Sequence, residues 1–303
     1  MAEADTRPPP PLGIRTWPTW LGIGAMALLA RLPWGLQRVL GHALGGLLHA
    51  TLARRRHIAT RNLALCFPEL DDARRAALVR AHFTALGIGV FEFARAWWGS
   101  VAPLRRGLEV EGLEHMEAAR TGGRGVIVVS GHFTTLEVCG RLMCDHVPLA
   151  GMYRQHAQAA MEWAVRRGRA RYAAAMFPKQ DLRGAVRHLK RGGLLWYAPD
   201  QDPSRGDSVY VPFFGQPAHS LTSTHQLARM SGAAVLFFQH RRRDDGSYAL
   251  KLWPAGPGYP GADAAADTAL VMAAIEEMAR AAPAQYLWIH RRFKRRPDGA
   301  SPY

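Results

Sequence analysis

The sequence predicts an α/β protein with a mostly parallel or mixed central sheet, covered by helices on both faces and preceded by an N-terminal membrane-anchoring helix. Three observations lead to this fold class. Short apolar runs alternate with amphipathic segments through most of the chain, which is typical of strands covered by helices. A length of 303 residues, 48% of them hydrophobic, provides one large core. An apolar stretch containing tryptophans lies near the N-terminus.

The N-terminal region has two parts. Residues 1–15 are polar and rich in proline, and we expect them to form a disordered tail. Residues 16–53 are predicted to form a membrane anchor, either as a tilted span or as a helix lying in the interface. The uncharged run 16–30 is shorter than the roughly 20 residues that a single crossing needs. A buried core helix and a cleaved signal peptide are the alternatives for this stretch.

Aromatic and basic residues in this region favour the membrane interpretation. Trp17, Trp20 and Trp34 suit the interface, because an indole combines an apolar ring with a polar N–H group. The three arginines at 54–56 favour anionic headgroups on the cytoplasmic side. The net charge of +15 also predicts polyanionic partners, whether nucleic acid, an anionic membrane surface or phosphorylated substrates.

Residues 54–303 form the predicted main domain. Two helices open it, the second capped by Asp71 or Asp72 and continuing through Trp98. Strands and helices then alternate. The expected strands are residues 125–130, 149–154, 193–199, 208–214, 233–243 and 248–254. The expected helices begin near Thr135 and cover residues 159–173, 181–192, 222–232 and most of 261–293, the last capped by Asp267.

Cysteine and histidine spacings predict neither a disulfide nor a metal site. The three cysteines match no zinc or redox pattern, so we expect free thiols in a reducing compartment. The thirteen histidines form no metal-ligand spacing with a nearby carboxylate, so no metal is predicted.

A histidine and a glutamate follow the most apolar strand, in the stretch "SGHFTTLE". Positions five apart on a helix point about 140° away from each other. His132 and Glu137 therefore meet only if His132 lies in the loop and Glu137 in the first helical turn. Thr134 is then the N-cap, and "TTLE" is a capping box, which alone accounts for Glu137 without any catalysis.

The catalytic interpretation gives both side chains a role. Glu137 accepts a hydrogen bond from one ring nitrogen of His132, and the other nitrogen takes a proton from a hydroxyl group. The helix N-terminus favours a developing oxyanion. No serine elbow or reactive cysteine motif accompanies the pair, so we expect the substrate hydroxyl to attack directly.

The same residues resemble a known family. "GHFTTLE" is similar to the H-x-x-x-x-D/E motif of the glycerolipid and lysophospholipid acyltransferase superfamily. The branch most similar is the bacterial lipid A late acyltransferases, the lauroyl and myristoyl enzymes. The resemblance covers about residues 55–299 and rests on an ordered set of segments: "RNLALCFPEL", "MYR", "MEWAVRRGRARYA", "KQDLRGAVRHLKRGG", "WYAPDQD", "VPFFG" and "APAQYLWIHRRFKRRPDG".

This resemblance implies an enzyme on the cytoplasmic face of the inner membrane that needs no metal or organic cofactor. It implies transfer of a fatty acyl group from acyl carrier protein to the 3-hydroxyl of a hydroxyacyl chain of a lipid A precursor of the Kdo2-lipid IVA type. His132 is then the general base and Glu137 its partner. Arg154 and Arg169 bind phosphate or the oxyanion, and Asp200 has a structural or polarising role.

Two alternatives stay open. One is an acyltransferase for another glycolipid or a lysophospholipid. The other is a basic peripheral membrane or nucleic-acid binding protein, although a nucleic-acid binder needs neither the tryptophans nor the His–Glu pair, so we expect no nucleic acid partner. The basic runs 166–171, 240–243 and 291–296 are also compatible with solvated faces. "QPAHSLTS" departs from the family pattern, so His219 receives no role, and neither acyl chain length, the acylated chain nor oligomeric state follows from the sequence.

Overall fold

The structure is a computed structural model that describes residues 9–204 and 206–303. Part of the expected tail, residues 1–8, therefore lies outside the described residues. The remainder of that tail leads into a single 3₁₀ turn, Ile14–Thr16.

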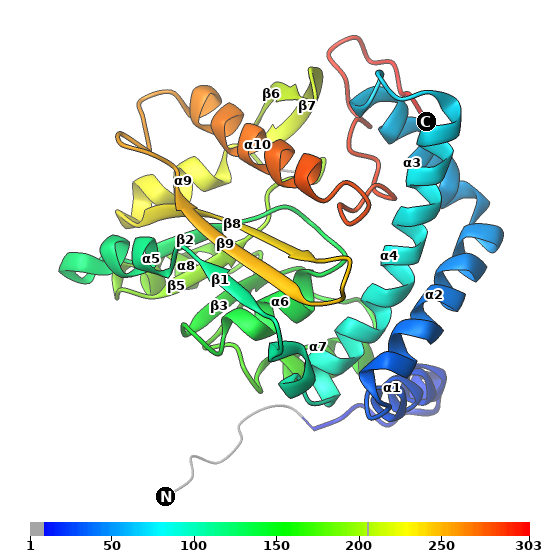
Figure 1. Ribbon diagram of the computed structural model, residues 1–303. Coiled ribbons are helices and arrows are strands. Elements are labelled where there is room, and N and C mark those ends of the chain that lie inside the picture. Colours follow the sequence, from blue (N-terminus) through cyan, green and yellow to red (C-terminus); the bar gives the residue numbers. More distant parts are fainter. Residues whose placement is uncertain (1–8, 205) are drawn as a thin grey trace, which may run out of the picture.

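A seven-stranded sheet forms the centre of the described part of the chain (Figure 1). Its strand order is β1-β9-β8-β2-β5-β3-β4, and every neighbouring pair is parallel except β8 with β9. The strands are β1 (Glu109–Glu111), β2 (Val126–Val129), β3 (Leu149–Tyr153), β4 (Met176–Pro178), β5 (Leu194–Tyr197), β8 (Ala234–Arg242) and β9 (Tyr248–Pro254). The predicted mixed, mostly parallel sheet is confirmed.

Helices cover both faces of this sheet, as predicted. The helices of the described residues are α1 (Trp17–Leu29), α2 (Trp34–Thr51), α3 (Ala53–Cys66), α4 (Asp72–Trp98), α5 (Leu113–Arg120), α6 (Leu136–Met143), α7 (Ala159–Arg169), α8 (Leu182–Lys190), α9 (Ser223–Ser231) and α10 (Ala264–Ala281). The central strand β2 is completely buried, because its side chains alternate between two cores. Ile127 and Val129 pack with α8, α9 and α10, whereas Val126 and Val128 pack with α5 and α6.

Two expectations about the C-terminal half were wrong. Residues 208–214 were expected as a strand of the main sheet, but β6 (Ser208–Phe213) instead forms a separate hairpin with β7 (Gln216–Leu221). The last helix ends at Ala281, and its cap is Asp263, which accepts from the Ala265 N–H group. The residues beyond α10 leave the helix and bury several aromatic side chains instead.

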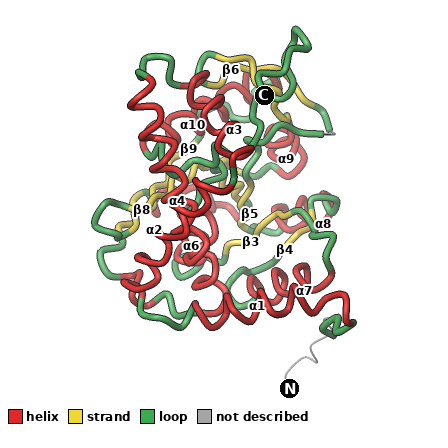
Figure 2. The backbone as a smooth tube through the Cα atoms, turned by 90° about the vertical axis from the view of Figure 1, so that its right-hand side faces the viewer, coloured by secondary structure: helices red, strands yellow, loops and turns green. Residues whose placement is uncertain are grey.

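The N-terminal helices pack along α4 (Figure 1). Gly87 of α4 lies so close to α2 that an added Cβ would come within 2.2 Å of the carbonyl oxygen of Gly41. The chain changes direction at Pro33, between α1 and α2. Helix α1 lies beside α7, as Figure 2 shows. Among the described helices, α4 is the one whose length and composition would suffice for a membrane crossing, and one side of it is buried in the protein.

Most of the large apolar side chains that the described residues leave exposed belong to this N-terminal region. They are Leu12, Ile14, Trp17, Leu21, Leu28, Leu36, Val39, Leu47 and Leu52. Exposed apolar side chains concentrated in one region of a protein are typical of a protein or membrane interaction site.

Candidate active site

The ring of His132 is held by Asp200. The Nδ1 atom of His132 lies 2.5 Å from Oδ1 of Asp200, and the backbone N–H group of His132 donates to Oδ2 at 2.9 Å. His132 follows β2 and Asp200 follows β5, and these two strands are parallel neighbours. The carboxyl ends of parallel strands meet at one edge of a sheet, which is where α/β proteins bind their ligands. The fold therefore brings together two residues 68 positions apart.

The expected pairing of His132 with Glu137 was wrong. Residues 132–134 pair with residues 285–287: the Leu287 N–H group donates to the carbonyl of His132 at 2.9 Å, and the Thr134 N–H group donates to the carbonyl of Gln285 at 2.8 Å. This short pairing fixes the backbone of the histidine loop against residues 285–287. The Glu137 side chain instead belongs to a different cluster.

The capping-box alternative was also wrong. Helix α6 begins at Leu136 with Thr135 as N-cap, and no side chain caps its N-terminus. The hydroxyl of Thr135 lies 3.0 Å from Nδ1 of the buried His240. Glu137 is thus explained neither by a cap nor by the histidine.

Glu137 accepts four hydrogen bonds within its own cluster. Three reach Oε1, from Trp97 Nε1 at 2.6 Å, Arg169 Nε at 2.9 Å and the Tyr172 hydroxyl at 2.5 Å. The fourth joins Arg169 Nη2 to Oε2 at 2.7 Å. Two parallel N–H bonds of this kind make a bidentate ion pair, which fixes both the position and the orientation of the guanidinium group. Helix α7 is thereby tied to α4 and α6.

The charges of the His132–Asp200 pair reinforce each other. Burial lowers the pKa of His132, but the charge of Asp200 and its hydrogen bond outweigh burial and raise the pKa above its ordinary value. Burial raises the pKa of Asp200, yet His132 and the hydroxyl of Tyr286 hold it well below its usual range. Asp200 is therefore a carboxylate near neutral pH and stabilises an imidazolium. The His132 side chain is 31% exposed, whereas that of Asp200 is 2% exposed.

The Glu137–Arg169 pair also keeps both of its side chains charged. Burial raises the pKa of Glu137, but the charge of Arg169 and the hydrogen bonds to the carboxylate lower it overall. Burial lowers the pKa of Arg169, and the charge of Glu137 more than reverses that effect. Removing one member of a buried pair leaves the other charge uncompensated, which costs roughly 3–5 kcal/mol.

The other sequence-predicted arginine, Arg154, lies at the same edge of the sheet. It follows β3, whose carboxyl end meets those of β2 and β5, and it is exposed. The structure thus brings together His132 with Asp200, and Glu137 with Arg169, and it leaves Arg154 at the surface nearby.

Several residues of the site gave no signal in the sequence. Tyr286 donates to Asp200, and Trp97 and Tyr172 donate to Glu137. Burial, together with the charge of the nearby His132, lowers the pKa of His240 to about 3. These residues are distant in the chain from the motif that they support.

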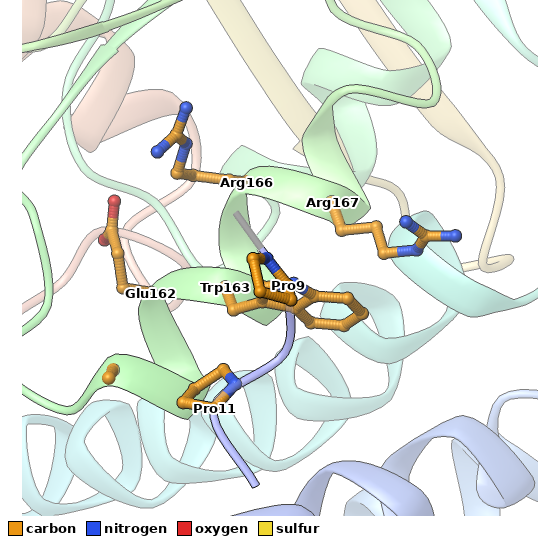
Figure 3. Close-up of a pocket in the computed structure, with 7 residues that line it drawn as sticks. Pro9, Pro11, Glu162, Trp163, Arg166 and Arg167 are labelled. Carbon is orange, nitrogen blue, oxygen red and sulfur yellow. The ribbon is translucent and has the colours of Figure 1, made fainter. Parts of the chain in front are cut away.

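A cavity of 280 Å³ opens between the N-terminal segment and α7 (Figure 3). Its lining is mostly apolar with charged side chains at the margin, and consists of Pro9, Pro11, Ala159, Glu162, Trp163, Arg166 and Arg167. Trp163 packs edge-to-face against Trp20 of α1, with ring centroids 5.2 Å apart. The cavity therefore adjoins the exposed apolar surface of the N-terminal helices.

Comparison with known proteins finds one family and several relatives that span nearly the whole chain. Residues 10–295 match the family described as bacterial lipid A biosynthesis acyltransferase. A lipid A biosynthesis palmitoleoyltransferase of Escherichia coli K12 is 40% identical over 289 residues, which cover 95% of this chain and 94% of the relative. A lipid A biosynthesis lauroyltransferase of the same organism is 39% identical, covering 94% of each chain. A lipid A biosynthesis acyltransferase of Haemophilus influenzae is 32% identical, covering 96% and 94%.

Proposed function

The chain belongs to the bacterial lipid A biosynthesis acyltransferase family, and we propose that it transfers a fatty acyl group from acyl carrier protein to the 3-hydroxyl of a hydroxyacyl chain of a lipid A precursor. That it is an acyltransferase of lipid A biosynthesis follows from the family. The donor and the acceptor position are the proposal.

The observation that carries the proposed chemistry is the 2.5 Å contact between His132 and Asp200. With Nδ1 bound to the carboxylate, Nε2 is the nitrogen that takes the proton from the acceptor hydroxyl. The hydroxyl oxygen then attacks the thioester carbonyl, and the imidazolium returns the proton to the departing thiol. Asp200 holds the ring in the correct tautomer and stabilises the positive charge that develops on it.

Glu137 takes a role different from the one that its spacing suggested. Since its carboxylate is occupied by Arg169, Trp97 and Tyr172, we infer that it acts by holding Arg169 in place. Arg169 and the exposed Arg154 are proposed to contact the phosphate groups of the lipid or the oxyanion of the reaction. A guanidinium group suits both, because its planar fork matches phosphate and carboxylate oxygens.

The N-terminal region is proposed to bind the cytoplasmic face of the inner membrane. Helix α1 has 13 residues and a length of about 20 Å, well short of the roughly 30 Å apolar thickness of a bilayer. Its exposed apolar side chains and the adjoining cavity with Arg166 and Arg167 instead suit a helix that lies in the interface. The net charge of +15 complements both anionic lipids and an acidic carrier protein.

The test uses the purified full chain with a lipid A precursor and a series of acyl carrier proteins loaded with different chains. We expect one added acyl group by mass spectrometry, and loss of activity by a factor of about 10²–10⁴ in His132→Ala, the usual cost of removing a general base. A donor series is necessary because the relatives at 40% and 39% identity carry names with different acyl chains. Undiminished transfer by His132→Ala would refute the mechanism. Failure of every loaded acyl carrier protein in the series to act as donor would refute the proposed donor.

A further inference from the structure

His219, to which the transfer reaction gives no role, lies in a second cluster. Its Nε2 atom is 2.7 Å from the hydroxyl oxygen of Ser208, and its Nδ1 atom is 3.6 Å from Oδ1 of Asp202. A hydroxyl, an imidazole and a carboxylate thus follow one another in the order found in Ser-His-Asp triads. The sequence gave no sign of a nucleophilic serine, because these three residues share no local motif.

The hairpin and the loop after β5 create this arrangement. Strands β6 and β7 pair so that Tyr210 lies opposite His219, and Ser208 lies two residues before Tyr210. Side chains two residues apart on a strand share a face, so the serine and the histidine emerge on one side of the hairpin. Asp202 belongs to the loop that also carries Asp200, so one loop presents a carboxylate to each of two histidines.

Two further contacts hold the ring and the backbone of His219. The ring of Tyr210 packs on it, with centroids 5.0 Å apart. The carbonyl of His219 accepts from Nη1 of the buried Arg292 at 2.7 Å. The Asp202 carboxylate is fixed by the Arg295 N–H group, which donates to Oδ2 at 3.0 Å, and the guanidinium Nε of Arg295 lies 3.4 Å from Oδ1.

The distance of 3.6 Å between Nδ1 of His219 and Oδ1 of Asp202 is slightly too long for a hydrogen bond. Nδ1 of His219 and Oδ1 of Asp202 are both buried, and among the described residues neither atom has a hydrogen-bond partner. Closing that gap by well under 1 Å satisfies both atoms in one hydrogen bond and orients the ring toward Ser208. Such contacts are commonly long in proteins without substrate and shorten when substrate binds.

We propose that Ser208, His219 and Asp202 form a second nucleophilic site, which takes acyl groups from thioesters independently of His132. The Ser208 oxygen attacks the thioester carbonyl while His219 takes its proton. The carbon–sulfur bond then breaks, the thiol leaves with that proton, and the acyl group remains as an ester on Ser208. Water repeats the sequence in place of the serine, releases the fatty acid and restores the hydroxyl. This activity goes beyond the proposed function and does not depend on it.

The test is covalent labelling of the full chain in detergent with a fluorophosphonate, which reacts with activated serines and resembles the tetrahedral intermediate. We expect one adduct, located on Ser208 by tandem mass spectrometry. His219→Ala and Asp202→Asn are expected to slow its formation at least tenfold. The matched control is Ser204→Ala, because Ser204 is an exposed serine of the same loop, and it is expected to label at the wild-type rate. His132→Ala is likewise expected to label normally, which separates this site from the transferase site.

Absence of an adduct on Ser208, or an unchanged labelling rate in His219→Ala, would overturn the proposal and reduce the Ser208–His219 contact to a structural hydrogen bond. A second comparison keeps the test decisive if His219→Ala does not fold, as judged by circular dichroism. Ser208→Cys retains His219, and its thiol is expected to react with iodoacetamide at least tenfold faster than that of Ser204→Cys. Equal rates for the two cysteines would also refute activation by His219.

Discussion

Replacing Asp200 with asparagine tests the site most directly, because the two side chains have nearly the same shape. The carboxylate accepts from Nδ1 and from the backbone N–H group of His132, and also from the hydroxyl of Tyr286. A carboxamide has one acceptor oxygen and one donor nitrogen. At least one of these contacts therefore places a donor against a donor. The ring is then free to adopt the tautomer with its proton on Nε2, and a protonated Nε2 cannot act as the base.

The expected loss in rate is large. Removing an effective general base costs on the order of 10²–10⁴ in rate, which corresponds to about 3–5.5 kcal/mol in the activation barrier. Asp200→Asn is expected near the upper part of this range, because it removes both the correct tautomer and the charge that stabilises the imidazolium.

The pH dependence gives an independent readout with a definite sign. The base must be neutral, so the wild-type rate rises with pH through the pKa of His132, which lies above its ordinary value of 6.5 because of Asp200. In Asp200→Asn the charge is gone while burial still lowers the pKa of His132. The acid limb of kcat/KM is therefore expected to move to lower pH, with a much lower plateau.

The assay is the initial rate of acyl transfer between pH 5 and pH 9, followed by mass spectrometry of the lipid product. Asp181→Asn is the control, because Asp181 caps α8 at the surface and asparagine is an equally good N-cap. An acid limb that stays in place, or activity within twofold of the wild type, would refute the role given to Asp200.

Three further outcomes follow from the structure. Glu137→Gln leaves the partly exposed Arg169 without its counterion, so we expect a loss of about 3 kcal/mol, the lower end of the range for breaking a buried ion pair, in the free energy of unfolding measured with urea. The same variant leaves the acid limb of His132 in place, and a shifted limb would contradict the separation of the two pairs. Gly87→Ala forces a Cβ to within 2.2 Å of a carbonyl oxygen of α2, so we expect a loss of roughly 1–3 kcal/mol by urea unfolding; unchanged stability would show that the helices separate without cost. Leu21→Glu changes a side chain that is 74% exposed, so unfolding in water is expected to stay within about 0.5 kcal/mol of the wild type while sedimentation with phosphatidylglycerol vesicles falls severalfold; equal sedimentation would place the membrane surface elsewhere.

Long, strongly patterned elements could be predicted from the sequence. The uninterrupted apolar run of β2 and the cap and helical spacing of α4 led to correct elements. The edge strands β1 and β4 could not be predicted, because three residues are too few to show an alternating pattern. The strand expected at residues 208–214 is present as β6, but its pairing with β7 was not predicted, because alternation shows that a segment is a strand but not which strand it pairs with.

The sequence identified residues of the candidate site but not the partners to which their side chains bind. His132 and Glu137 were identified from their spacing, yet their actual partners come from loops and helices far away in the chain. The stretch 285–287 shows why: its sequence was assigned to the last helix, but its backbone pairs with residues 132–134 and sets where the histidine lies. A spacing motif cannot reveal a partner that tertiary structure supplies.

The two ion pairs explain why one short motif contains both a histidine and an acid that do not touch. Oε1 of Glu137 already accepts three hydrogen bonds, and Oε2 accepts one from Arg169, so little of its acceptor capacity remains for an imidazole. We therefore expect any influence of Glu137 on the reaction to pass through Arg169, Trp97 or Tyr172. The motif therefore contributes to two separate ion pairs near the start of α6: the proposed base His132, which Asp200 holds, and Arg169, which Glu137 holds. Losing Asp200 should change the pH profile, whereas losing Glu137 should change stability and the binding of anionic groups.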